Sequence, residues 1–226
     1  MRSGRLLGAG LDADAVRLAA VGLVRLATNE WLGEAAGAPA WVWQLRAASF
    51  ADTWLAFAGP AAPGLRAPAG TVVRAVAYRA AELVLDARAE DAPAALEWLG
   101  LRSAEARDRA CRTGAAHPAE PAALALVWHG VQAITALGAH TAEGREPHDR
   151  RIAERRDAYV RERHHRQDTL ALLLSCARIA AAALVEASDG DAGRADRWLE
   201  EEAARCMRPG GLVPLWVPGR PGPPAG

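Results

Sequence analysis

Alanine is the residue that most limits what this chain can fold into. Of the 226 residues, 55 are Ala, whereas Phe and Tyr contribute only 2 each. Ala is the strongest helix former, and sheets depend on the β-branched and aromatic side chains that are scarce here. The composition therefore predicts an all-α protein. The chain is also long enough to bury a continuous core without disulfide or metal cross-links.

Hydrophobic periodicity and helix-capping residues predict a single helical bundle of about eight helices. The bundle is expected over residues 1–208, followed by an extended Pro- and Gly-rich tail, residues 209–226. No repeat with a period of 20 to 50 residues is visible. The helices are expected from Asp12 to Gly33, Trp41 to Ala58, Thr71 to Ala87, Asp91 to Trp98, Ser103 to Arg112, Ala122 to Gly138, Asp149 to Gln167, Leu170 to Ala187 and Asp191 to Met207.

Several features separate these helices. The segment from Gly59 to Gly70 holds three Pro and three Gly and is expected to be an irregular linker. Gly100 is expected to end a short helix, and a polar loop is expected from His140 to Pro147. The stretch from Asp149 to Ala187 could form one long helix or two, and we favour a break at the capping pair Asp168–Thr169.

An aromatic stripe gives the helix from Trp41 to Ala58 its clearest pattern. Trp43, Ala47, Phe50, Trp54 and Phe57 recur at helical spacing on one face. Such a stripe usually faces the core, so this helix is expected to form the core together with the helices 122–138 and 170–187. The alternative is an exposed aromatic platform for a ligand or a partner.

The balance of charges and the spacing of the cysteines indicate what the protein can bind and in which compartment it functions. Basic and acidic residues number 27 each, so no net positive field attracts a polyanion. Every basic residue is Arg, which together with the abundant Ala, Gly and Pro indicates a high-GC bacterial genome. The 3 Cys are widely separated and form no C-x-x-C motif, which favours a reducing cytoplasm. His129 and Arg178 interrupt the most apolar stretches, so no membrane span is expected.

Histidines are confined to one part of the chain, and they suggest an alternative function. All 6 His lie between residues 117 and 165, so a metal-assisted hydrolase using region 117–168 is the alternative prediction. Antiparallel helix packing, however, is expected to place His129 opposite Tyr159 and to disperse the His residues. The candidate metal ligands of this reading are His140, His148, Asp149, His165 and Asp168.

The Arg-rich helix expected over residues 150–166 suggests a third and less favoured function, nucleic-acid binding. Acid-to-base pairs at a spacing of four residues, Asp157–Arg161 and Glu162–Arg166, instead favour a solvated or subunit-facing helix. No aromatic residues alternate with the Arg residues in the way that single-strand binders require.

The tail is the preferred candidate for partner binding. Five apolar side chains lie within six residues of this Pro-rich segment, more than a solvated linker needs. They are expected to fold back onto a groove of their own domain or, less favoured, to dock on another chain. No catalytic or cofactor-binding motif is present, so the preferred function is a non-enzymatic, oligomeric interaction or scaffold protein without a cofactor. The proposed partner-binding residues are Leu212, Val213, Leu215, Trp216 and Val217.

Overall fold

The computed structural model confirms the all-α fold. It describes residues 13–35, 37, 39–58, 67–113, 118–136, 142–163 and 166–206, and every regular element within these ranges is a helix. The eight helices of the described residues are α1 (Ala13–Ala35), α2 (Ala40–Ala58), α3 (Ala67–Asp86), α4 (Ala92–Thr113), α5 (Ala119–Thr135), α6 (Ala142–Arg163), α7 (Arg166–Ala187) and α8 (Ala192–Cys206).

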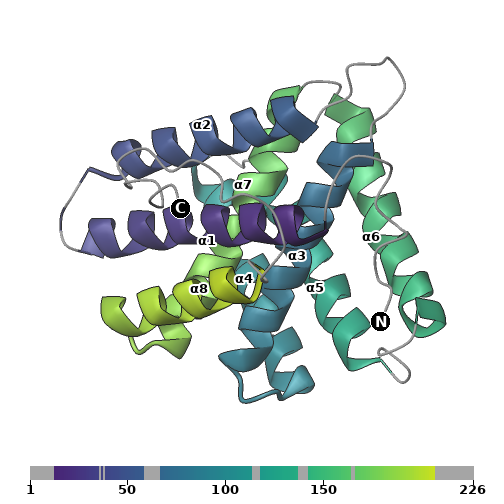
Figure 1. The fold of residues 1–226 in the computed structure, drawn as a ribbon. Helices are drawn as coiled ribbons and strands as arrows, with labels where there is room; N and C mark the ends of the chain where they lie inside the picture. Colours follow the sequence, from purple (N-terminus) through teal and green to yellow (C-terminus); the bar gives the residue numbers. More distant parts are fainter. Residues whose placement is uncertain are drawn as a thin grey trace, which may run out of the picture.

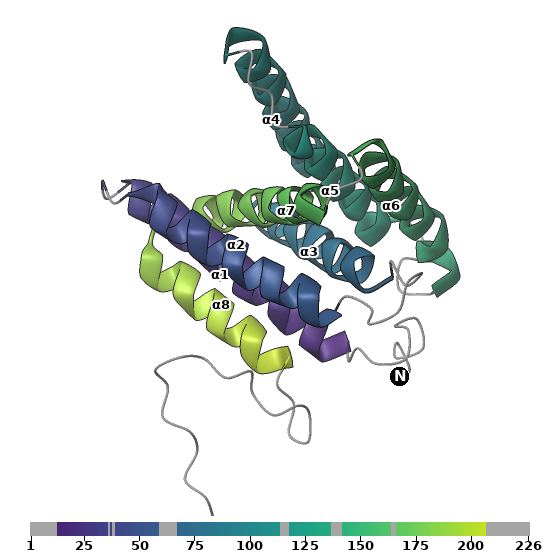
Figure 2. The same ribbon diagram turned by 90° about the horizontal axis from the view of Figure 1, so that it is seen from above.

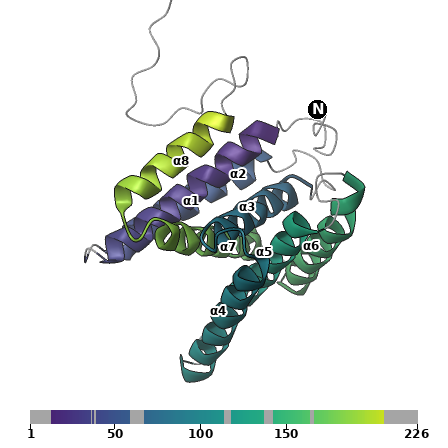
Figure 3. The same cartoon turned by 90° about the horizontal axis from the view of Figure 1, so that it is seen from below.

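The helices form three layers. Helices α3 and α7 pack against each other in the middle of the molecule. Figures 2 and 3 show α8, α1 and α2 side by side on one face of this pair, and α4, α5 and α6 on the other. Each outer layer therefore takes helices from both halves of the chain, α1–α4 and α5–α8 (Figure 1).

The core is centred on α3 rather than on α2, which corrects the expectation from the aromatic stripe. Helix α3 buries its Val and Leu side chains completely, including Val73, Val76 and Leu83. The buried side chains described in α2 are the small residues Ala47 and Ala51. Helix α2 lies in an outer layer, where small side chains let it approach α1 and leave its larger residues toward solvent.

Part of the aromatic stripe does pack inward. The ring of Phe50 lies so close to Gly22 of α1 that a Cβ at Gly22 would meet the ring at 2.9 Å. Trp43 is half-buried, and its ring lies 4.9 Å from the guanidinium of Arg46. The side chains of Trp54 and Phe57 are outside the described residues, so the rest of the stripe stays a prediction.

Two predicted helix boundaries are wrong, each because tertiary packing outweighs a local breaker. Helix α4 runs without interruption through Gly100, where a stop was expected. Helix α3 begins at Ala67, inside the expected linker, with Pro68 in its first turn, where proline is tolerated.

The start of α6 and its separation from α7 also differ from the prediction. Helix α6 begins at Ala142 and includes Pro147, so the expected polar loop is largely helical. Helix α6 ends at Arg163 and α7 begins at Arg166, so the helix is not interrupted at Asp168–Thr169, and Asp168 lies in the first turn of α7. The prediction of two helices rather than one long helix is confirmed.

Helix α7 is the one helix in the described part of the chain that is long and apolar enough to cross a membrane. The expectation that this stretch is too interrupted for a span is therefore not supported by its length and composition. Most of it is buried within the bundle, which is typical of the core helix of a soluble protein.

The packing of the helices repeats between the two halves of the chain. Helix α1 packs on α2, α3, α7 and α8, and α5 packs on the equivalent helices α6, α7, α3 and α4. Exchanging α1–α4 with α5–α8 therefore leaves the set of helix contacts unchanged. This is the relationship produced by a pseudo-two-fold axis through the α3–α7 pair, and Figure 2 shows the matching arrangement of the outer layers.

Burial follows the same relationship residue by residue. Moving the buried positions of α1 forward by 103 residues reproduces all eight buried positions of α5, and Ala19 alone lacks a buried equivalent. In α3 and α7, a shift of 100 residues matches eight buried positions, including Val73 with Leu173 and Ala77 with Ala177.

The α3–α4 and α7–α8 turns are equivalent in backbone and in sequence. Their conformations match, with positive φ at Ala89 and Glu90 in one turn and at Asp189 and Gly190 in the other. The same five residues then recur 100 positions apart, which a search for periods of 20 to 50 residues does not detect. The matching pairs are Asp91 and Asp191, Ala92 and Ala192, Ala95 and Ala195, Trp98 and Trp198, and Leu99 and Leu199.

The conserved turn geometry has a local cause in the two aspartates. Asp91 Oδ1 accepts a hydrogen bond from the backbone nitrogen of Ala94 at 3.1 Å, and Asp191 Oδ1 accepts one from Arg194 at 2.8 Å. Each Asp thus caps the first turn of the following helix.

Candidate functional site

The residues of the metal-site prediction are not gathered into one site in the described structure. Asp149 accepts a hydrogen bond from the hydroxyl of Tyr78 at 2.6 Å and lies 3.9 Å from Arg74, so it joins α6 to α3. Asp168 lies in the first turn of α7, and His140 and His165 are outside the described residues. Among the described side chains, no group of three His, Cys, Asp or Glu could hold a metal ion.

His129 and His148 interact electrostatically, so they lie closer together than the predicted helix register implies. Because α6 begins at Ala142 rather than near Asp149, antiparallel packing places His129 of α5 beside the first turns of α6. Burial lowers the pKa of His129; a hydrogen bond with Gln132, at 3.1 Å, opposes this effect, and the charges of Arg155, Arg151 and His148 add to it. The cluster is cationic, so it disfavours a metal ion.

Some guanidinium groups of the Arg-rich helix α6 pack against other helices, and others are exposed to solvent. Arg156 packs against α3, where a Cβ added to Gly70 would collide with its guanidinium, and it bonds to Asp157 at 2.7 Å. Arg150 pairs with Glu146 at 2.7 Å on the exposed face. These contacts are those of a solvated helix with one packed side, and nucleic-acid binding through residues 150–166 receives no support from them.

Burial limits the reactivity of the Cys176 thiol. Cys176 of α7 is completely buried, and burial raises the pKa of its thiol to about 12. A thiol with such a pKa carries almost no thiolate near neutral pH and is a poor nucleophile. Cys176 is therefore not a candidate nucleophile.

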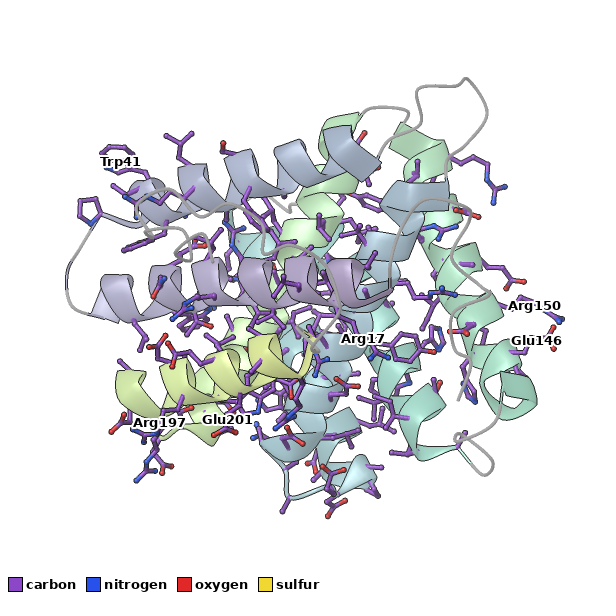
Figure 4. The ribbon with its side chains drawn as sticks, in the orientation of Figure 1. Arg17, Trp41, Glu146, Arg150, Arg197 and Glu201 are labelled. Carbon is purple, nitrogen blue, oxygen red and sulfur yellow. The ribbon has the colours of Figure 1, made fainter. Side chains whose placement is uncertain are left out.

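A different surface emerges at the end of the α1–α2 hairpin. Trp31 of α1 is 41% exposed, and Trp41 and Leu45 of α2 are each 64% exposed. We call these three residues the α1–α2 apolar surface. Figure 4 shows Trp41 projecting from the first turn of α2, away from the body of the molecule.

A buried carboxylate supports this surface from beneath. Glu30, next to Trp31 in the chain, is only 6% exposed. It accepts a hydrogen bond from Gln44 at 2.8 Å and one from Arg178 of α7 at 3.2 Å. Gln44 is in turn the neighbour of Leu45. The network therefore holds α1, α2 and α7 together through residues that neighbour Trp31 and Leu45 in the chain.

The equivalent surface in the second half of the chain is less apolar. The counterpart of Trp31 is Ile134, which is partly buried against the core, and the exposed residues near the start of α6 include Glu146 and Arg150. Figure 4 shows Glu146 and Arg150 on α6 at the opposite side of the molecule from Trp41. The fold therefore does not require large apolar side chains at this position.

Sequence reasoning missed the α1–α2 apolar surface, although one signal was available. Trp41 and Leu45 are four residues apart, and their face of α2 differs from that of Ala47 and Ala51. The predicted partner-binding residues of the tail lie outside the described residues. Comparison of the chain with protein-family models, with curated proteins and with solved structures finds no match.

Proposed function

We propose that this protein is a non-enzymatic interaction protein that self-associates through the α1–α2 apolar surface. The observation that carries the proposal is the exposure of Trp31, Trp41 and Leu45 at one end of the α1–α2 hairpin. Trp is enriched among the residues that contribute most to protein–protein binding, because one side chain buries a large apolar area.

The support beneath the surface favours binding. A surface held in place before binding loses little conformational entropy when a partner docks. The contacts of Glu30 with Gln44 and Arg178 provide this rigidity, since they join three helices below the exposed side chains. In the equivalent α5–α6 hairpin the exposed residues Glu146 and Arg150 are charged, which favours a role other than folding for Trp41 and Leu45.

The occupant that we propose is the apolar tail segment, residues 212–217, of a second copy. Pro214 and Pro218 favour an extended polyproline-type conformation, and such segments dock on aromatic surfaces like that of Trp31 and Trp41. The ion pair between Arg25 and Asp196 places α8 antiparallel to α1, so α8 ends near the start of α1.

The length of the chain favours a second copy over the same copy. The ten residues from Cys206 to Trp216 span at most ~33 Å when fully extended. The path within one chain runs ~20 Å along α1 and across two helix spacings of ~9 Å each, around the outside of the bundle. This path of about 38 Å is longer than the reach of the connection, so docking within one chain is excluded by this path length. A second copy removes that constraint, and this is a change from the preference that the sequence suggested.

Sedimentation velocity over a wide range of protein concentration tests the proposal. The unmodified chain is expected to associate as its concentration rises, and the variant Trp41→Ala/Leu45→Ala is expected to stay monomeric. Leu101→Ala is the matched control, because Leu101 is 60% exposed but lies on α4. Circular dichroism establishes that each variant keeps its helices.

Deletion of residues 211–226 tests the occupant separately. The truncated chain is expected to stay monomeric, like the α2 variant. Continued association of the truncated chain would exclude the tail as the occupant, and an unmodified chain that is monomeric at every concentration would refute self-association. Stoichiometric zinc, manganese or iron in the purified protein would favour the metal-assisted hydrolase instead. The cytoplasmic location and the bacterial origin stay predictions.

A further inference from the structure

We infer that the chain is the single-chain form of a two-fold dimer. Its halves, α1–α4 and α5–α8, are two copies of one four-helix unit, and the surface that each half presents to the other fits a second copy of that unit. This inference is independent of the proposed function, because it concerns the interface inside the molecule rather than the exposed hairpin.

The two halves are intertwined rather than merely adjacent. The fourth helix of each half covers the first helix of the other, since α8 packs on α1 and α4 packs on α5. Helices α3 and α7 bury their apolar faces mainly against helices of the opposite half. A four-helix unit alone would leave this face open, and a second unit closes it.

Polar contacts between the halves follow the same arrangement. Arg79 of α3 pairs with Glu202 of α8 at 2.6 Å, and Arg102 of α4 pairs with Glu186 of α7 at 2.8 Å. Arg102 and Glu202 are equivalent positions, 100 residues apart, and each makes an ion pair with the opposite half. Their charges are opposite, so two initially equal surfaces have diverged into complementary ones.

The conformation of the turns argues against coincidence. Positive φ is strained for non-Gly residues, yet Ala89 and Glu90 adopt it with φ of 52° and 63°. Asp189 and Gly190 adopt nearly the same backbone with φ of 53° and 73°, and there the Gly suits it. Different residues thus keep one turn geometry, which is expected of two copies of one unit that have since diverged.

The pseudo-two-fold relationship determines how long a new connection must be. Cys206 at the end of α8 is equivalent to Ala106, and Ala13 at the start of α1 is equivalent to Ala116. Residues 107–115 fill the corresponding stretch of the chain between Ala106 and Ala116, and residues 107–113 of this stretch are the last turns of α4. A copy of these nine residues should therefore join α8 to α1 without distorting either helix.

A circular permutant tests this geometry. The permutant begins at Pro118, runs to Cys206, continues through the copy of residues 107–115, and then runs from Ala13 to Thr113. It is expected to be as helical as the natural chain and to melt within about 5 °C of it, since a free-energy change of roughly 1 kcal/mol shifts Tm by a few degrees. A reference permutant joins the same ends through the natural residues 207–226 and 1–12.

Linker length provides the control. A permutant that joins Cys206 directly to Ala13 is expected to lose helicity or to melt much lower, because adjacent Cα atoms are only ~3.8 Å apart whereas the axes of packed helices are ~8–10 Å apart. The inference is overturned if the nine-residue permutant fails to fold while the reference permutant folds. It is also overturned if the direct and the nine-residue permutants give the same Tm, since the connection would then be insensitive to the geometry.

Cleavage of the otherwise natural chain gives a second measurement. A protease site placed in residues 114–117 separates α1–α4 from α5–α8 after the chain has folded. The two fragments are expected to stay together as a one-to-one complex through gel filtration, with unchanged circular dichroism. Separation of the fragments would overturn the inference, even if both permutants had failed to fold.

Discussion

The indole nitrogen of Trp98 in α4 donates a hydrogen bond to the carboxylate of Glu186 in α7, at 3.2 and 3.1 Å from its two oxygens. The guanidinium groups of Arg88 and Arg102 lie 5.3 and 5.1 Å from the centre of the Trp98 ring. Both also bond to Glu186, at 2.5 and 2.8 Å. One carboxylate thus joins the α3–α4 corner of the first half to the second half.

This network predicts that acid destabilises the protein in part through Glu186. Burial raises the pKa of Glu186, but the bonds from Arg88, Arg102 and Trp98 outweigh it and hold the pKa below the ordinary value of 4.5. The unfolded chain therefore binds the proton more readily. The stabilisation is present above about pH 4.5 and is lost as the pH falls through the lower, folded-state pKa.

Urea unfolding as a function of pH measures this effect. Glu186→Gln should lose stability less steeply below about pH 4.5 than the unmodified chain does. The side chain is 35% exposed, so the difference should be under about 1 kcal/mol. Equal slopes for the two proteins would show that Glu186 does not contribute to acid sensitivity.

A buried ion pair predicts a larger effect in α8. Glu202 is only 4% exposed and pairs with both Arg79 and Arg205. Arg79→Met keeps the apolar stem but leaves the carboxylate poorly compensated, so it should cost roughly 3 kcal/mol in the free energy of unfolding. Arg205→Ala is the control, since Arg205 is 65% exposed and should cost less than about 1 kcal/mol. Equal losses in chemical denaturation would contradict this prediction.

Two glycines in helices should respond to alanine in opposite directions. A Cβ at Gly130 of α5 would lie 2.9 Å from the Cβ of Ala81 in α3, so Gly130→Ala should force the helices apart and cost about 1–3 kcal/mol. A Cβ at Gly100 of α4 would meet nothing within 4 Å, so Gly100→Ala should stabilise the protein by about 0.5–1 kcal/mol. Thermal unfolding of the two variants measures whether each substitution raises or lowers the stability. A destabilising Gly100→Ala would be inconsistent with a continuous α4.

The equivalent turns also predict a stabilising substitution. Glu90 has a φ of 63°, whereas Gly190 occupies the matching position with a φ of 73°. Glu90→Gly should relieve backbone strain and stabilise the protein by about 0.5–1 kcal/mol, and Gly190→Ala should destabilise it by a similar amount. Loss of stability in Glu90→Gly, measured by urea unfolding, would show that the strain at this turn is compensated by other contacts.

Local chemistry determined much of the secondary structure. The abundance of Ala determined the all-α class, and Asp91 and Asp191 determined where α4 and α8 begin, because an Asp side chain caps the following turn whatever the surroundings. The helix predicted from Trp41 to Ala58 differs from α2 by one residue. These features depend on neighbours within one or two turns, so the sequence alone contains them.

Tertiary structure decided which helix faces are buried and where a helix continues through a Gly or a Pro. Gly100 and Pro147 continue inside helices because packing of α4 on α5 and of α6 on α5 stabilises these helices by more than the local penalty. Because α6 begins at Ala142 rather than at Asp149, His148 lies closer to His129 than the predicted helix boundary implied. Ala47 rather than Trp41 faces inward because only close contact with α1 and α7 selects a small side chain. Most of the pseudo-two-fold relationship was equally hidden, since outside the five identical residues that begin α4 and α8 it lies in burial and backbone geometry that Ala, Val and Leu satisfy interchangeably.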